Sequence, residues 1–113
     1  MKSPPVLNRR LLLETPERVA DGAGGFVETW VTKGTIWAEI TPHNGRERAG
    51  EEVTLSRVPY RIIVRAAPYG APSRPRPGER FREGSRLYRI LAVTEAERRV
   101  HYLTCFAEEE TPV

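Results

Sequence analysis

The sequence predicts an all-β protein, a small antiparallel β-barrel of six to seven strands with a long polar loop and little or no helix. Three observations support this fold class. Apolar and polar residues alternate with a period of two through most of the chain, which is the spacing of side chains on one face of a strand. Nine glycines and ten prolines bound short apolar segments as turns do. No segment shows an amphipathic helical pattern, and a barrel leaves no open sheet edge.

In the first half of the chain we expect strands at residues 8–14, 26–32 and 35–41. Pro16 is expected to end the first strand, because proline cannot donate a backbone hydrogen bond. The sequence DGAGGF at 21–26 is a strong turn signal before the second strand. Residues 33–34, Lys-Gly, are expected to make a tight turn into the third strand, which Pro42 ends.

In the second half, residues 42–52 are polar, and 53–58 are compatible with an extended segment. The clearest strand is 60–67, where Tyr60, Ile62 and Val64 share one face. A loop at 68–77 contains four prolines, and further strands are expected at 86–94 and 99–107. The length fits one domain, 1–113, with a flexible N-terminal arm at 1–7 and an acidic C-terminal tail at 108–113.

Charge is distributed unevenly, although the net charge is only +3 and the pI is near 9.4. Acidic residues end the chain, and arginines gather in one segment: Glu108, Glu109 and Glu110, against Arg74, Arg76, Arg80, Arg82, Arg86 and Arg89. The arginines form either a solvated face with salt bridges to neighbouring subunits or a basic strip for nucleic acid, with Phe81 and Tyr88 available for stacking. The mild net charge favours the first interpretation.

Residues that could carry chemistry are few. His43 and His101 have no cysteine or carboxylate cluster beside them, so no zinc site is expected. The sequence contains no Gly-rich phosphate loop and no Gly-x-Ser-x-Gly motif. Cys105, the one cysteine, is expected to be a small core or interface residue. Trp30 and Trp37 are expected in the core, with an interface role second. We therefore predict no enzyme, no cofactor and no metal.

No targeting or membrane segment is expected either. The apolar run at 11–13 is far too short for a signal peptide or a membrane span. A single cysteine allows no disulfide within the chain, which fits synthesis in the cytoplasm.

The order of motifs resembles the phage head–tail joining family, also called head-closure or stopper proteins. The residues that carry the resemblance extend from about 8 to 108, and they are RRL at 9–11, DGAGGFVETW at 21–30, IWAEI at 36–40, GRE at 45–47, YRIIVR at 60–65 and GSRLYRILAV at 84–93. The loop at 68–77 departs from the family pattern in its length and its content of proline and arginine.

The resemblance implies a structural subunit of a virion neck, assembled in the host cytoplasm of a phage or of a gene transfer particle. It implies a ring of six or twelve copies, with the portal-bound adaptor on the head side and a tail terminator or tail tube protein on the tail side. Such a ring closes the DNA channel, docks the tail, touches packaged double-stranded DNA transiently and has no membrane partner. Two alternatives remain, a tail terminator of the same particle and a stand-alone OB-like nucleic-acid-binding barrel.

The resemblance also implies a channel-facing loop, for which residues 42–57 are the best match. In this loop Arg46 and Arg48 are candidates for DNA contact, and Glu47, Glu51 and Glu52 for repelling DNA or pairing between subunits. A closed ring needs two complementary faces on each subunit. The candidates are the arginines Arg74, Arg76, Arg80, Arg82 and Arg86 on one side and the acidic Glu108, Glu109 and Glu110 on the other. No catalytic, cofactor-binding or metal-binding residue is expected.

Overall fold

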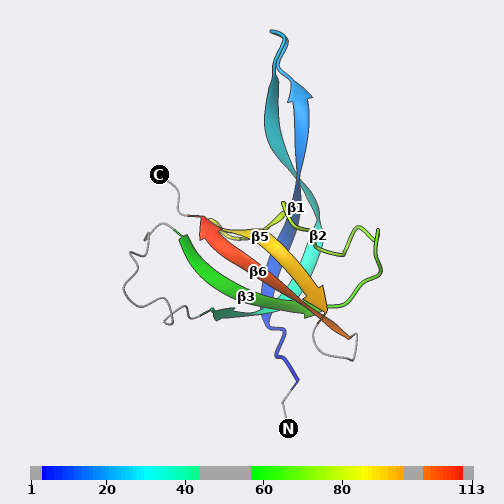
Figure 1. Ribbon diagram of the computed structural model, residues 1–113, viewed down its shortest axis with the longest axis vertical. Coiled ribbons are helices and arrows are strands. Elements are labelled where there is room, and N and C mark those ends of the chain that lie inside the picture. Colours follow the sequence, from blue (N-terminus) through cyan, green and yellow to red (C-terminus); the bar gives the residue numbers. More distant parts are fainter. Residues whose placement is uncertain (1–3, 44–56, 96–100, 111–113) are drawn as a thin grey trace.

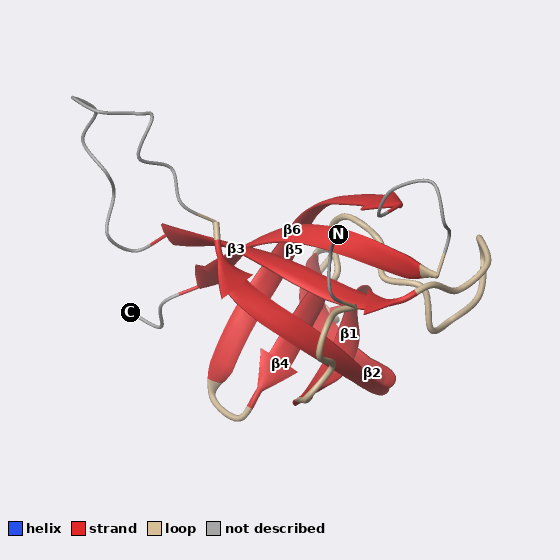
Figure 2. Ribbon diagram, turned by 90° about the horizontal axis from the view of Figure 1, so that it is seen from below, coloured by secondary structure: helices blue, strands red, loops and turns tan. Residues whose placement is uncertain are grey.

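The computed structural model describes residues 4–43, 57–95 and 101–110, and their only regular elements are antiparallel strands (Figures 1 and 2). The six strands are β1 Arg9–Ala20, β2 Phe26–Pro42, β3 Arg57–Arg65, β4 Arg80–Glu83, β5 Arg86–Glu95 and β6 Tyr102–Glu110. The prediction of an all-β antiparallel fold is confirmed. Within the described segments, no helix is long and apolar enough to cross a membrane.

The sheet closes on itself in the order β1-β2-β3-β6-β5-β4, with β4 pairing back onto β1. Closure therefore depends on the short strand β4, which pairs through Leu12↔Arg82, Leu13↔Phe81 and Glu14↔Arg80. The sequence pattern did not predict β4 as a strand, because its four residues are mostly charged and too short to show a period.

The core lies inside this closed sheet and follows the period of two. Ile62 and Val64 share one face of β3 as predicted, and that face points inward, where Tyr60 packs against the same cluster. Cys105 is fully buried, which confirms its expected place in the core. The buried cluster comprises Leu11, Leu13, Ala38, Ile62, Val64, Phe81, Tyr88, Ile90, Leu103, Cys105 and Ala107.

The tight turn predicted at residues 33–34 is wrong, because β2 runs through both residues. Leu13 pairs with Gly34 and Glu14 pairs with Thr32, so Lys33 is an extra residue on β2. Such an inserted residue is a β-bulge, which bends a strand and increases its twist. Gly34 adopts a φ of 153°, a conformation that residues with a Cβ rarely adopt.

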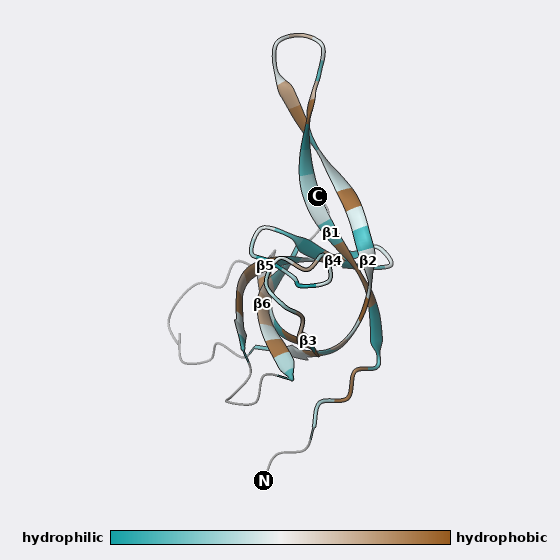
Figure 3. Ribbon diagram, turned by 90° about the vertical axis from the view of Figure 1, so that its right-hand side faces the viewer, coloured by the Kyte–Doolittle hydropathy of each residue, from teal (hydrophilic) through white to brown (hydrophobic). Residues whose placement is uncertain are grey.

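The predicted end of the first strand at Pro16 is also wrong. Beyond Glu14, β1 pairs only with β2, so Pro16 needs no donor for a third strand. We call this two-stranded extension, residues 14–32, the arm. It projects from the barrel (Figures 1 and 3) and lengthens the molecule to 57 Å.

The predicted turn at the tip of the arm is held by Asp21. Its carboxylate accepts hydrogen bonds from the backbone N–H of Ala23 at 2.8 Å and of Gly25 at 3.0 Å. These two bonds lower the pKa of Asp21 below its ordinary value, and the bond from Ala23 has the larger effect.

Candidate assembly surfaces

One end of the barrel carries a cluster of ion pairs. Arg9 donates to both carboxylate oxygens of Glu83 at 2.7 and 2.6 Å. Arg86 donates to both oxygens of Glu109 at 2.8 and 3.1 Å and to the hydroxyl of Tyr60 at 3.3 Å. These two-point contacts fix orientation as well as charge. They tie β1 to β4 and β5 to β6 at this end.

The arginines lower the pKa of both carboxyl groups. The hydrogen bond from Arg9 is the largest cause for Glu83, and the bond from Arg86 is the largest for Glu109. Both groups are therefore charged at neutral pH.

The predicted channel loop starts and ends at this same end of the barrel. Pro42 pairs with Tyr60 at the end of β2, and Arg57 pairs with Glu110 at the start of β3. Its candidate residues Arg46, Glu47, Arg48, Glu51 and Glu52 lie in 44–56, outside the described residues.

The arm leaves the barrel at the opposite end of β2, and its base is held by a buried carboxylate. Glu14 is 4% exposed. It accepts from the Nε atoms of Arg80 at 2.6 Å and Arg82 at 2.8 Å. Burial raises the pKa of Glu14, but the bonds from the two arginines outweigh burial and lower it below its ordinary value. The Arg80 guanidinium also lies 4.0 Å from the ring centre of Trp30 in the arm.

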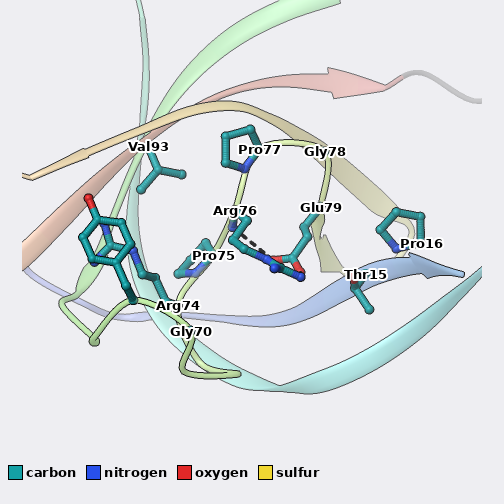
Figure 4. Close-up of a pocket in the computed structure, with 11 residues that line it drawn as sticks. Thr15, Pro16, Gly70, Arg74, Pro75, Arg76, Pro77, Gly78, Glu79 and Val93 are labelled. Carbon is teal, nitrogen blue, oxygen red and sulfur yellow. Dashed lines mark hydrogen bonds and ion pairs between the residues drawn. The ribbon is translucent and has the colours of Figure 1, made fainter.

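A second buried carboxylate, Glu79, links the bulge to the proline-rich loop. Lys33, the extra residue of the bulge, donates to Glu79 Oε2 at 2.9 Å. The backbone N–H of Arg76 donates to Oε1 at 3.0 Å, and its guanidinium reaches Oε2 at 3.4 Å. Figure 4 shows Arg76 and Glu79 beside a cavity of about 610 Å³, which residues of the loop line together with Thr15 and Pro16 of the arm.

Arg74 is buried rather than displayed on the surface. It donates to the backbone oxygen of Ala67 at 2.8 Å and stacks 3.9 Å from the ring centre of Tyr69. The predicted loop at 68–77 therefore folds back on itself around this arginine.

The candidate interface residues thus make many contacts within one chain. Arg86 and Arg89 pair with Glu109 and Glu110, so arginines and glutamates predicted for two faces lie together at one end of the barrel. The last strand extends to Glu110 and includes Glu108, Glu109 and Glu110. Pairing of these residues between subunits stays a prediction.

The arm carries an apolar surface that the sequence analysis missed. The register places Val19 opposite Val27, and Thr15 opposite Val31, on one face. All three valines are at least 40% exposed. We call Val19, Val27 and Val31 the valine face. The signal was present as alternating residues on both sides of the turn, but alternation shows only that one face is apolar, and not what covers it.

The outer face of the barrel also carries an apolar groove. Trp37 is 51% exposed, so its expected place in the core is wrong. Its neighbours in β2, Ile36 and Ala38, face the core, and Trp37 therefore points to the other side of the strand. With Leu7, Ile36, Arg65 and Ala66 it lines a cavity of about 440 Å³, which we call the Trp37 groove. Trp30 is half-buried beneath Arg80.

The described residues contain no cluster of three or more histidine, cysteine, aspartate or glutamate side chains that could hold a metal ion. His101 is exposed, whereas His43 is half-buried and packs edge-on against Phe106 at 5.8 Å.

The chain matches one protein family and is similar to chains of known structure. Residues 2–110 match the model of a family described as phage head completion protein. A chain in the structure of the virion of a native gene transfer agent particle is 60% identical, with 97% of this chain and 100% of that chain covered and a TM-score of 0.79. A solution structure of a Shigella flexneri 2a protein is 20% identical over 91% and 92% of the two chains, with a TM-score of 0.65, and it supports the fold alone. No curated protein sequence matches.

Proposed function

Because the chain belongs to the phage head completion protein family, we propose that it is a structural subunit that joins the head to the tail in a phage-like particle. It forms a ring between the portal-bound adaptor and the tail, closes the DNA channel after packaging and docks the tail. The protein is a component of the virion.

The observation that carries this proposal is the likeness to a chain of a gene transfer agent virion. That likeness covers both chains almost completely at 60% identity. At this identity and coverage, two chains share their fold from end to end. A gene transfer agent particle is therefore the context that fits this chain best.

The geometry of β2 supports a role as a connector. This strand carries the arm at one end and leads into the predicted channel loop at the other. A subunit with extensions at opposite ends of one strand can contact a neighbour with one and the channel with the other. The loop sequence at 42–57 carries both signs of charge, which suits a gate that neither holds DNA tightly nor excludes it.

Cryo-electron microscopy of the native head–tail junction tests the position. We expect this chain as a ring between the adaptor and the tail, with residues 42–57 toward the channel. Density for the chain at the tail end of the junction instead would indicate the tail-terminator function. Its absence from the junction would refute the proposal and leave a nucleic-acid-binding barrel, to be measured as salt-dependent binding of free DNA.

The gate role is tested separately by deleting residues 46–52. Heads that lack tails should then lose packaged DNA faster, because the segment proposed to close the channel is shortened. A control variant replaces the same residues by a glycine-serine segment of equal length, which separates the loss of charge from the loss of length. Unchanged DNA retention, with the normal amount of this chain in the heads, would contradict the gate.

A further inference from the structure

The arm is a two-stranded ribbon with unpaired edges. From Glu14↔Thr32 to Ala20↔Phe26, seven residue pairs connect β1 only to β2, except for the contact of Glu14 with β4 at the base. At about 3.3 Å per residue the ribbon extends about 20 Å. An isolated two-stranded ribbon is marginally stable in water, and open strand edges invite pairing or cover.

The base of the arm is nevertheless fixed by several contacts. Glu14 binds Arg80 and Arg82, Arg80 stacks on Trp30, and Lys33 binds Glu79. A ribbon held this firmly at its base presents its far end in a defined direction. That arrangement lowers the entropy lost when the arm binds a partner.

The surface of the arm combines apolar and acidic groups. The valine face holds Val19, Val27 and Val31, and Glu17 lies on the same face opposite Thr29. Figure 3 shows the apolar bands near the far end of the arm. Glu28 and Asp21 are exposed nearby. The one basic residue of this part, Arg18, stacks on Phe26 of its own chain at 4.6 Å.

The Trp37 groove combines apolar groups with basic ones, and its charge is thus opposite to that of the arm. Its apolar lining residues include Trp37 of β2, Leu7 of the N-terminal segment and Ala66 after β3. Arg10 lies opposite Trp37 in the β1–β2 register, and Arg65 lines the groove itself. Both arginines are exposed, and neither makes an ion pair with another described residue.

We propose that the valine face of the arm packs into the Trp37 groove of the next copy of this chain, with the acidic groups of the arm beside Arg10 and Arg65. The arm and the groove are different surfaces of one subunit, so the contact is heterologous, and repeated contacts of this kind close a ring. An apolar centre with charged groups at its rim is the usual arrangement of such an interface. This inference rests on the proposed ring, and it names the surfaces that build the ring.

The test is a cysteine pair in purified particles. Val27→Cys in the arm is combined with Thr35→Cys, at an exposed residue that also lines the Trp37 groove, and a short bismaleimide is added. The native Cys105 does not interfere, because it is fully buried and burial raises its pKa to about 12. We expect a ladder of covalent multimers of this chain that ends at the ring size, and at least tenfold less of it in each single-cysteine variant. Val19→Cys replaces Val27→Cys if the first variant melts at a lower temperature.

A matched pair of variants tests the energetics. Val27→Ser should lower the amount of this chain in particles at least tenfold, since it places a polar group in the apolar centre. Leu91→Ser, at a residue that is 51% exposed on β5, should leave it unchanged, because it removes a similar exposed apolar group away from both surfaces.

The outcomes separate this inference from the proposed function. If wild-type particles contain the chain but the cysteine pair gives no ladder, or Val27→Cys couples to another protein, the arm contact is refuted while the connector function stands. If Trp37→Ala leaves the ring intact and only weakens binding of DNA, the groove binds nucleic acid and the inference is wrong. If wild-type particles lack the chain, the proposed function fails and the inference falls with it.

Discussion

At the scale of single residues, two buried carboxylates organise the junction between arm and barrel. Glu14 and Glu79 are 4% and 2% exposed, and each binds two basic side chains. A carboxylate is removed from water at a high cost, which these partners offset. Glu14 bridges two residues of β4, Arg80 and Arg82, and so fixes the position at which β4 pairs with β1 and closes the barrel.

Replacing Glu14 by glutamine tests this role. Glu14→Gln leaves Arg80 and Arg82 without their counter-charge, one of them largely buried, and we expect a loss of about 3 kcal/mol in the free energy of unfolding. Urea denaturation followed by tryptophan fluorescence measures it. The control Glu110→Gln removes the exposed pair with Arg89 and should cost less than about 1 kcal/mol. Equal losses in both variants would contradict a special role for Glu14.

At the scale of elements, the bulge in β2 decides where the barrel ends and the arm begins. The extra residue Lys33 places its amine on Glu79, and Gly34 takes the positive φ that the bulge requires. The same strand thus serves as a wall of the barrel on one side of the bulge and as half of the arm on the other. The insertion of this one residue therefore sets the direction of the arm and of the valine face that it carries.

The bulge predicts a specific cost for a side chain at position 34. Open space surrounds an added Cβ there, since no atom lies within 4 Å, so strain in the backbone is the only penalty. Gly34→Ala should lower stability by about 1–2 kcal/mol, or the melting temperature by roughly 4–8 °C. The control Thr32→Ala, at an exposed residue of the same strand, should shift it far less. A melting temperature unchanged in Gly34→Ala would show that β2 bends without the positive φ.

At the scale of the whole molecule, ion pairs link neighbouring strands at both ends of the barrel. Arg9–Glu83 and Arg86–Glu109 act at the end near the predicted channel loop, and Glu14 acts at the base of the arm. The apolar core between them is small, as expected of a chain this short. Charge pairing therefore adds to this core in holding neighbouring strands together at the two ends.

This distribution predicts an acid-labile barrel. The pKa values of Glu14, Glu83 and Glu109 are lowered in the folded state, from an ordinary value of 4.5. Their contribution to stability is complete above the unfolded pKa and is lost as the pH falls through the folded pKa values. Urea midpoints should be constant from pH 7 to about pH 5 and fall below about pH 4.5.

A double variant, Glu83→Gln with Glu109→Gln, provides the comparison for this pH series. It should start from a lower midpoint at pH 7 and lose less on acidification, because two of the three titrating groups are gone. A wild-type midpoint that stays constant down to pH 3 would rule out the contribution of these pairs.

Much of the fold could be predicted because alternation reports one local fact, which face of a strand is apolar. That was sufficient for β3, where Ile62 and Val64 are buried. The turn at Asp21 was predicted from a different local signal, the glycine-rich sequence that follows this residue. It failed at Gly34 and Pro16, since a glycine can make a turn or a bulge and a proline can end a strand or occupy an open edge. The choice depends on whether a third strand lies alongside.

The candidate site was predicted less completely for the same reason. Charge clusters such as Arg74–Arg89 could be identified from composition, but their partners could not. Arg74 proved buried against Tyr69, and Arg86 binds Glu109 of its own chain. The predicted channel loop stays a prediction, with only its two ends at Pro42 and Arg57 described.

By itself the sequence determined the class of fold and, through its order of motifs, the family, because these depend on local periodicity and on residues in a fixed order. The tertiary structure decided the closure of the barrel through β4, the length and direction of the arm, and the exposure of Trp37 and the valine face. These features depend on which strands meet and in which register, and a residue's exposure depends on neighbours that are distant in the chain.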